Sequence, residues 1–429
     1  MRSAAMEIAS KSLAACDPLR ALKMQCAFKD GIFNAGAFTV EVADYDRVWI
    51  LGAGKATMAL AVGLEELLGE HLAGGIISVK NGTKVGTKKL LVYQAAHPIP
   101  NGVSNEAAKA IIALASKLNE RDLVFSIMTG GSSALLSLPV ANLSMDEKAA
   151  VHKVLLESGA PIGSINTVRK HLSNIKGGRL AKAIAPASIV NLTVSDVVGD
   201  RIDLITGPTV PDPSTLGEAR DVLTTYELWT EMPPKVVALL RAEQALEETP
   251  KVLSQTILTK VLVSGSTVCE EAAKQAKLLG FMPKILSTNL EGSAEDAVKM
   301  FLDAIQIARA TIGSHALIAG GETTIALPKN VSGTGGPNQH FAAAMAKAIK
   351  DDPLTVVLAI DTDGTDGPTT NAGGLVDGET YSRCENAGVD LDEELALFNS
   401  SRVLSASGDL VITGHTGTNV NDLKMVLLN

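Results

Sequence analysis

Residues 47–69 of the chain have the sequence RVWILGAGKATMALAVGLEELLG. The β-branched and aliphatic run at residues 47–51 predicts a buried strand, and the alanine- and leucine-rich stretch at residues 60–69 predicts a helix. The turn between them contains Gly52 and Gly54, whose lack of side chains lets backbone N–H groups face a ligand. This order of strand, glycine turn and helix is typical of parallel sheets that helices cover.

The same alternation continues along the chain. Further strands are expected at residues 75–79, 123–128, 188–194, 260–263, 316–319, 355–360 and 409–413, and further helices at 104–118, 144–158, 269–279, 293–311 and 338–350. We therefore predict an α/β fold with two domains, whose parallel or mixed sheets are flanked by helices. Prolines and charged residues interrupt the segment around Pro233 and Pro234, so we divide the chain into residues 1–240 and 241–429.

The composition of the 429 residues is that of a globular protein, with 46% hydrophobic and 20% charged residues. A net charge of −9 and an aromatic content of 3% argue against a nucleic-acid partner. No apolar run reaches the roughly 18–20 residues that span a bilayer, so we expect no membrane partner. Four scattered cysteines suit a reducing cytoplasm, and Glu7 and Lys11 make the N-terminal stretch an amphipathic helix rather than a signal peptide.

Six of the expected strands run directly into turns rich in Gly, Ser, Thr or Asp. These turns span residues 52–55, 129–133, 195–200, 320–323, 361–367 and 414–419. In α/β sheets, ligands bind at the carboxyl ends of strands, where backbone N–H groups and helix N-termini face an anion. The six turns together therefore predict a ligand site.

The first of these turns resembles two nucleotide-binding motifs and satisfies neither. Trp49 and Ala56 stand where a Walker A loop needs a glycine and a hydroxyl residue. Thr57 and Lys80 stand where a Rossmann fingerprint needs a small residue and an acidic one. Lys55 is expected to be a cation for phosphate oxygens, with a solvated lysine at the start of a helix as the alternative.

The turn at residues 129–134 follows a strand and opens a helix, as a nucleophile elbow does. Ala134 replaces the last glycine of that motif, but this difference alone does not exclude a serine hydrolase. We favour a cradle for a carboxylate or phosphate, made by backbone N–H groups and hydroxyls of Gly131, Ser132 and Ser133. A plain helix N-cap is the structural alternative.

Residues 166–179 gather cations in a segment that we expect to be helical. Arg169 and Lys176 are seven residues apart and so fall on the same helical face. Because the chain is acidic overall, this positive face favours anion binding, with a solvated surface as the alternative.

Asp361, Asp363 and Asp366 follow one strongly apolar strand. A hard cation relieves the repulsion of crowded carboxylates, and Mg²⁺ commonly takes one or two carboxylates together with phosphate oxygens. An Asx-rich turn is the alternative. Asp196 and Asp200, at another strand end, offer a metal ligand or general base, with a capping role as the alternative.

Seven histidines are scattered without the spacing of a metal site. His97 is the one that we expect to face a ligand, because Pro98 and Pro100 fix its loop. The others are expected to be surface or packing residues.

Together these motifs resemble those of the glycerate 2-kinase family, whose C-terminal part is called the MOFRL domain and some of whose members are named hydroxypyruvate reductases. The resemblance covers nearly the whole chain. It rests on residues 52–56, 97–100, 129–135, 166–181, 195–213, 320–324, 333–340, 363–368 and 416–422. It implies a Rossmann-like domain at 1–240, a MOFRL-type domain at 241–429 and an active-site cleft between them. It also implies ATP and Mg²⁺ as partners and phosphorylation of D-glycerate at its 2-hydroxyl.

On this basis we expect three groups of site residues. The catalytic group is Lys55, which neutralises the transferred phosphoryl group, Asp196, which orients or deprotonates the hydroxyl, and Arg169. The substrate group is His97, Gly131, Ser132, Ser133 and Lys176. The nucleotide group is Gly52, Gly54, Glu322, Asn338, Gln339, Thr418 and Asn419, with the metal at Asp361, Asp363 and Asp366.

The chain departs from the family pattern at one point. Where the family commonly has Gly-Gly-Arg-Asn-Gln-Glu, this chain has Pro337 in place of the arginine and His340 in place of the glutamate. Either Arg169, Lys176 or Lys55 supplies the missing charge, or phosphoryl transfer is weaker or altered.

Two alternatives to a kinase remain open on sequence grounds. One is an NAD(P)H-dependent hydroxypyruvate reductase, and the other is a non-catalytic sensor of sugar acids or nucleotides that lost transfer with the arginine. The oligomeric state is also open, with a homodimer as one option.

Overall fold

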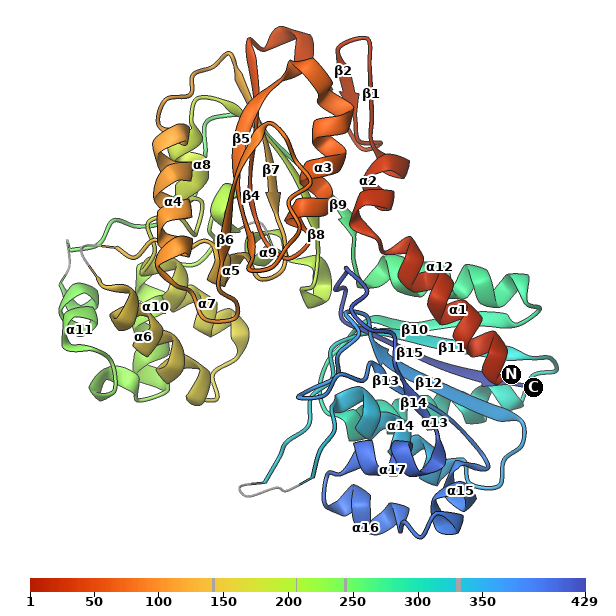
Figure 1. Cartoon of the computed structure of the whole chain (residues 1–429). Coiled ribbons are helices and arrows are strands. Elements are labelled where there is room, and N and C mark those ends of the chain that lie inside the picture. Colours follow the sequence, from red (N-terminus) through yellow and green to blue (C-terminus); the bar gives the residue numbers. More distant parts are fainter. Residues whose placement is uncertain (141–142, 206, 243–244, 329–332) are drawn as a thin grey trace. The chain divides into compact units, whose positions relative to one another are not determined.

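The computed structural model describes residues 1–140, 143–205, 207–242, 245–328 and 333–429 (Figure 1). The chain divides into two compact units. The N-terminal unit comprises Leu22–Val194 and Arg201–Leu262, and the C-terminal unit comprises Met1–Ala21, Ser195–Asp200 and Val263–Asn429.

This division differs from the predicted boundary between residues 240 and 241. The segment after residue 240 contains β9 (Ile257–Val263), which extends the sheet of the N-terminal unit next to β8 (Ser188–Val194). At the other end of the chain, α1 (Arg2–Ala15) packs on α12 (Gly265–Leu278) in the C-terminal unit. Long-range packing of this kind leaves no mark in local composition.

The N-terminal unit is built on a six-stranded sheet with the strand order β6-β5-β4-β7-β8-β9. The strands not yet given are β4 (Arg47–Ala53), β5 (Leu72–Lys80), β6 (Leu90–Ala95) and β7 (Asp122–Met128). Neighbouring strands from β6 to β8 pair in parallel, and β7 is buried along its whole length, as in sheets covered on both faces.

Helices cover both faces of this sheet (Figure 1). On one face α4 (Gly102–Ala115) and α8 (Arg179–Ile184) enclose a core that includes Leu51 and Val124, and α3 (Thr57–Leu68) covers the opposite face. A small antiparallel sheet adds β1 (Ala27–Lys29), β2 (Ile32–Asn34) and β3 (Thr39–Glu41). The remaining short helices are α2 (Pro18–Gln25), α5 (Ser132–Leu135) and α9 (Ile202–Ile205).

A separate group of helices has its own hydrophobic core in this unit. It consists of α6 (Met145–Glu157), α7 (Ile162–His171), α10 (Leu216–Thr225) and α11 (Pro234–Arg241). Capping boxes, Ser144 with Glu147 and Thr215 with Glu218, fix where α6 and α10 begin. Buried leucines and valines such as Leu155 and Val168 hold α6 against α7.

The C-terminal unit contains a mixed six-stranded sheet with the order β10-β11-β15-β12-β13-β14. Its strands are β10 (Met282–Leu290), β11 (His315–Gly321), β12 (Thr355–Asp361), β13 (Gly373–Asp377), β14 (Leu410–Val411) and β15 (Asp422–Leu428). The helices α1 and α12 cover one face, and α13 (Ala294–Arg309), α14 (Pro337–Ala348) and α17 (Ser400–Ser407) cover the other (Figure 1). Two shorter helices are α15 (Thr380–Asn386) and α16 (Leu391–Ala396).

The predicted α/β class with parallel and mixed sheets is confirmed. The central strand β15 was not predicted, because its apolar residues follow directly on a polar motif at the chain end. The strand expected at residues 409–413 is only two residues long. In the part of the chain that the structure describes, no helix is long and apolar enough to cross a bilayer.

Phe301 provides a test of the C-terminal core. Its side chain is fully buried, and its ring packs edge to face on that of Phe341, with ring centroids 5.4 Å apart. We expect Phe301→Ala to lower the free energy of unfolding by about 3–5 kcal/mol, because the change leaves a cavity. Urea denaturation measures this difference. Ile307→Ala, at an exposed position of the same helix, is the matched control and should change stability by less than about 0.5 kcal/mol.

Candidate functional site

Two of the predicted turns of the N-terminal unit lie side by side. The strands β4 and β7 are parallel neighbours, so their carboxyl ends meet at one edge of the sheet. The backbone N–H of Lys55 donates to the carbonyl oxygen of Gly130 at 2.9 Å, and that of Thr129 donates to Ala53 at 3.0 Å. The glycine turn after β4 and the serine turn after β7 therefore form one surface.

Close packing explains the glycines of these turns. A Cβ atom on Gly52 would lie 2.4 Å from Ile127, and one on Gly54 would lie 2.0 Å from the hydroxyl of Thr129. Contacts with β7 and with the turn that follows it therefore explain why both positions are glycine, without a nucleotide. Gly131 has a φ of +83°, and a Cβ there would lie 3.0 Å from Nε2 of His97 and 3.3 Å from Cγ of Lys55.

Three basic side chains, Lys148, Arg169 and Lys176, gather beside the serine turn, and we call them the basic cluster. Nζ of Lys176 donates to Oγ of Ser133 at 2.8 Å. Nη1 of Arg169 donates to Oδ1 of Asn166 at 3.1 Å. Nζ of Lys148 is buried and has no hydrogen-bond partner among the described residues. Within the described ranges, no carboxylate forms an ion pair with any of the three.

The pKa values show that these cations act on one another. Burial and, to a smaller extent, the nearby charge of Arg169 together lower the pKa of Lys148 to about 7. Burial, Arg169 and Lys148 also hold the pKa of Lys176 well below its ordinary value. His152 faces all three cations, and burial together with their charge lowers its pKa to about 4. Buried charges of one sign are costly without a counter-ion, so this cluster is suited to an anion.

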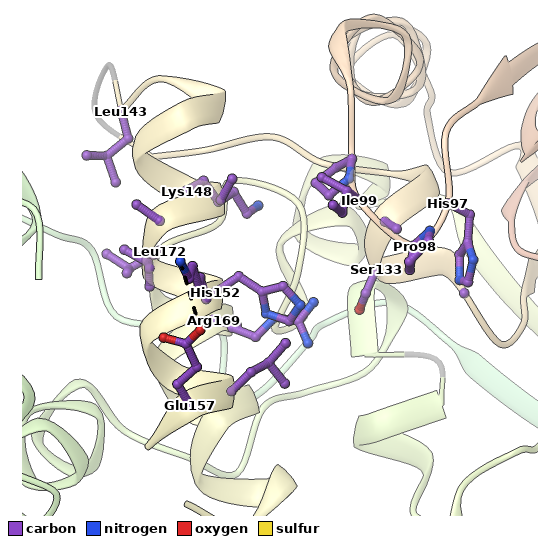
Figure 2. Close-up of a pocket in the computed structure, with 18 residues that line it drawn as sticks. His97, Pro98, Ile99, Ser133, Leu143, Lys148, His152, Glu157, Arg169 and Leu172 are labelled. Atoms are coloured by element: carbon purple, nitrogen blue, oxygen red, sulfur yellow. Dashed lines mark ion pairs between the residues drawn. The ribbon is translucent and has the colours of Figure 1, made fainter. Parts of the chain in front are cut away.

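A cavity of about 580 Å³ lies between α6, α7 and the loop that carries His97 (Figure 2). Lys148, His152 and Arg169 line it together with Ser133 and His97. A smaller adjoining cavity of about 40 Å³ is lined by Ser132, Ser133, Arg169 and Lys176, among others. Burial and the charges of Lys55 and Lys80 lower the pKa of His97, which favours a neutral imidazole there.

The expected helical face with Arg169 and Lys176 is wrong in detail. Helix α7 ends at His171, and the two side chains come together because the chain turns after the helix. The other cations of the segment have structural partners: Lys170 bonds to Asp203 and Asp212, each at 3.0 Å, and Arg179 donates to backbone carbonyls. Only part of the predicted positive run therefore faces the site.

Sequence reasoning missed Lys148 and His152. They are four residues apart on α6 and so share one helical face. Lys153 stands beside them on the same helix and is exposed, so local sequence does not distinguish the buried lysine from the solvated one. The i, i+4 spacing of a lysine and a histidine is the signal that could have raised the question.

In the C-terminal unit, Asp422 marks the place where two strands end. Both β11 and β12 pair antiparallel with β15, so their carboxyl ends meet beside the first residue of β15. In register, Asp422 lies opposite Gly321 on one side and Asp361 on the other. The turns after β11 and β12, both predicted from the sequence, are thus brought together.

A buried lysine organises this junction. Lys424 is 1% exposed, and its Nζ donates to Oδ2 of Asp422 at 2.6 Å and to Oδ1 of Asn338 at 2.8 Å. Nδ2 of Asn338 donates in turn to Oδ1 of Asp422 at 2.6 Å. Asn338, predicted as a nucleotide ligand, is therefore part of a fully bonded network, and neither Lys424 nor Asp422 was singled out from the sequence as a site residue.

The three predicted metal ligands have different surroundings. Both carboxylate oxygens of Asp366 accept bonds from the backbone and side-chain N–H groups of Asn338 and Gln339, so Asp366 caps α14. Oδ1 of Asp363 accepts from the backbone and hydroxyl of Thr365. Burial raises the pKa of Asp361, and the carboxylates of Asp363 and neighbouring aspartates raise it further. Among the described residues, no three acidic, histidine or cysteine side chains are arranged to hold a metal ion.

Other predicted residues join the same region of the C-terminal unit. Burial raises the pKa of Glu322, and the charges of Asp422 and Asp196 raise it as well. The hydroxyl of Thr418 is buried without a partner among the described residues, and Oδ1 of Asn419 accepts from the backbone N–H of Asn421. Asp196 therefore belongs with Asp361, Glu322 and Asp422, and we call this group of carboxylates the acidic junction.

Pro337, in place of the family arginine, begins helix α14 after the N-cap residue Gly336. Proline suits this position, because its missing N–H would have no partner in the first turn. His340 stacks on Phe398 with ring centroids 5.5 Å apart, and its Nε2 lies 3.4 Å from Glu295. Both replacements thus serve the local structure, and Pro337 brings no charge.

The two ends of the chain match two family models: residues 4–241 match a domain of unknown function, DUF4147, and residues 315–422 match the MOFRL family. The chain is 37% identical over 438 residues to a glycerate 2-kinase of Pyrococcus horikoshii, which covers 100% of this chain and 97% of that one. The chain belongs to the glycerate 2-kinase family. A crystal structure of a glycerate kinase from Thermotoga maritima is 36% identical, with a TM-score of 0.87 over 100% of this chain and 99% of that one.

Some members of the glycerate 2-kinase family have a different name. A putative hydroxypyruvate reductase of Agrobacterium vitis is 36% identical over 387 residues and covers 89% of this chain and 99% of that one. The resemblance to this family is confirmed. The roles of the individual site residues stay predictions.

The basic cluster makes a prediction about stability. The pKa of Lys148 falls from its ordinary 10.5 to about 7 in the folded protein, so between these pH values the unfolded chain binds more protons and stability rises with pH. At pH 7 we expect Lys148→Met to raise the free energy of unfolding by about 1–3 kcal/mol, because it removes a buried ammonium group that has no partner among the described residues. The gain should shrink towards pH 10.

Urea denaturation at pH 7 and at pH 9.5 measures both effects. Lys153→Met on the same helix is the matched control, because Lys153 is exposed and lies 3.9 Å from Glu157 in a surface ion pair. It should change stability by less than about 1 kcal/mol at either pH. A Lys148→Met protein that is less stable than the wild type at pH 7 would show that the cation is well compensated.

Proposed function

We propose that this protein transfers the γ-phosphoryl group of ATP to the 2-hydroxyl of D-glycerate, giving 2-phosphoglycerate and ADP. The observation that carries the proposal is the basic cluster beside the serine turn, which has no carboxylate partner among the described residues, in a chain of the glycerate 2-kinase family. Phosphoryl transfer of this kind depends mainly on positioning and on neutralising charge.

The carboxylate of the acid would bind at the serine turn. Oγ of Ser133 is already bonded to Lys176, and Arg169 lines the same small cavity, so three groups of the right kind converge there. Charge-assisted hydrogen bonds from lysine and arginine to a carboxylate are among the strongest that proteins make. These groups would fix the acid and present its 2-hydroxyl.

Lys55 would neutralise charge on the phosphoryl group in the transition state of its transfer. Its backbone is held to Gly130 by a hydrogen bond, its Cγ lies against Gly131, and its side chain is exposed. Electrostatic stabilisation by a donor aimed at the transferred group commonly supplies two or three orders of magnitude in rate.

The acidic junction of the C-terminal unit would serve the metal and the nucleotide. Mg²⁺ needs only one or two carboxylates when phosphate oxygens fill its other positions. Asp361 fits this need, since its raised pKa reports crowded carboxylates that a divalent cation relieves, and Asp363 is its neighbour. Mg²⁺ would supply neutralisation of phosphate charge. Asp196 would orient or deprotonate the substrate hydroxyl, and Glu322 and Thr418 would face the nucleotide.

The reductase alternative finds little support at the first glycine turn. A dinucleotide would need that turn to approach its pyrophosphate, yet contacts with β7 and with the turn that follows it already explain Gly52 and Gly54. Lys80, at the end of β5, is basic where a ribose ligand would be acidic.

Incubation of the purified protein with ATP, Mg²⁺ and D-glycerate, followed by phosphorus NMR, tests the reaction and its regiochemistry together. We expect 2-phosphoglycerate to form in step with ADP. Formation of 3-phosphoglycerate would refute the regiochemistry. Binding of both substrates without turnover would favour the sensor alternative.

The role of Lys55 is tested by substitution. We expect Lys55→Ala to lower kcat/KM for D-glycerate by about 100-fold or more, because it removes charge stabilisation of the transition state. Coupled measurement of ADP release gives this ratio. Lys109→Ala, at an exposed position of helix α4, is the control and should leave kcat/KM unchanged. A Lys55→Ala enzyme within twofold of the wild type would contradict the assignment.

A further inference from the structure

The cavity beside the basic cluster is larger than a three-carbon acid requires. Its volume of about 580 Å³ lies within the range of pockets that enclose ligands of drug size, about 300–1,000 Å³. The small adjoining cavity at Ser132, Ser133 and Lys176 is where the acid group of glycerate would bind. Most of the larger cavity would then stay unfilled.

The walls of the larger cavity are mainly apolar (Figure 2). Leu143, Val151 and Leu172 are buried in its lining, while Ile99 and Leu156 are 68% and 56% exposed. Apolar side chains that line a concave site and stay exposed are typical of surfaces that a ligand covers.

The polar groups of the cavity are concentrated and mostly cationic. Nζ of Lys148 and Nδ1 of His152 are buried without partners among the described residues, and Arg169 lies close enough to lower the pKa values of both. Figure 2 shows Lys148 extending from α6 toward the side where Ile99 lies. Among the described residues of the lining the one carboxylate is Glu157, and it is paired with Lys153 on the same helix, so the basic cluster stays available to a ligand.

We propose that this cavity binds 2-hydroxy acids with an alkyl substituent, their carboxylate at the basic cluster, where Arg169 lines both cavities, and their carbon chain between Ile99 and Leu156. The inference rests on the proposed function in one respect, that the acid group of the substrate binds at the basic cluster. It extends the substrate class from glycerate to 2-hydroxy acids with longer, apolar side chains. A free carboxylate and an apolar tail match the two kinds of surface that the cavity presents.

Calorimetric titration of the full-length protein with lactate, 2-hydroxybutyrate, 2-hydroxyhexanoate and 2-hydroxyoctanoate tests the proposal. We expect affinity to rise about fourfold for each added methylene, since each one removes apolar surface from water. Affinity that does not change with chain length would overturn the proposal. Displacement of 2-hydroxyoctanoate by ATP alone would also overturn it, because the cavity would then belong to the nucleotide.

Substitutions at the two ends of the cavity distinguish its apolar contribution to affinity from its cationic one. Leu156→Ser should abolish the gain with chain length and leave the affinity for lactate unchanged, and Ile99→Ser should do the same from the opposite wall. Both positions are exposed, so neither change should affect folding. Lys148→Met should weaken every acid in the series by the same factor, about tenfold or more. Equal loss for all acids in Leu156→Ser would refute the apolar contact.

Turnover of D-glycerate, measured separately, distinguishes this inference from the proposed function. Phosphorylation of glycerate together with chain-length-independent binding would overturn the inference alone. Tighter binding of longer acids without any phosphorylation of glycerate would support the inference and refute the kinase proposal.

Discussion

The proposed chemistry of the N-terminal unit depends on three cations that lie close together and have no carboxylate partner among the described residues. Lys148, Arg169 and Lys176 repel one another, and burial removes the water that would otherwise stabilise their charges. Packing of the helical group around Leu155 and Val168 must offset this cost. An anion that enters the site relieves the repulsion, so the free energy stored there becomes available for binding.

The C-terminal unit contains the opposite arrangement, a cluster of carboxylates instead of cations. Carboxylates meet there at the ends of β11 and β12, and the buried cation Lys424 is bonded to Asp422 and Asn338. Asp366 is satisfied by capping α14, whereas Asp361 keeps a raised pKa. The unit therefore combines a hydrogen-bonded network with a carboxylate that has no ion pair among the described residues, and this is the environment that a divalent cation suits.

Much of this arrangement could be predicted from local sequence. The strands and turns around Gly52 and Ser132 have clear periodicity and turn residues, so the edge of the first sheet was foreseeable. The role of Lys148 was not foreseeable, because only the fold decides which lysine of α6 has a buried ammonium group. The capping role of Asp366 depends on Asn338, a partner that is distant in the chain. Strand β15 was missed because it directly follows a polar motif. Contacts between remote segments were the missing information in each case.

Proton uptake during binding of D-glycerate tests most directly whether the basic cluster binds the carboxylate of the acid. At pH 8 Lys148, with a pKa of about 7, is mostly neutral in the free protein, and a bound carboxylate should restore its charge. Calorimetry in buffers of different ionisation enthalpy should therefore show net uptake that approaches about one proton per acid bound. A binding enthalpy that is the same in every buffer would contradict the cluster as the acid-binding site.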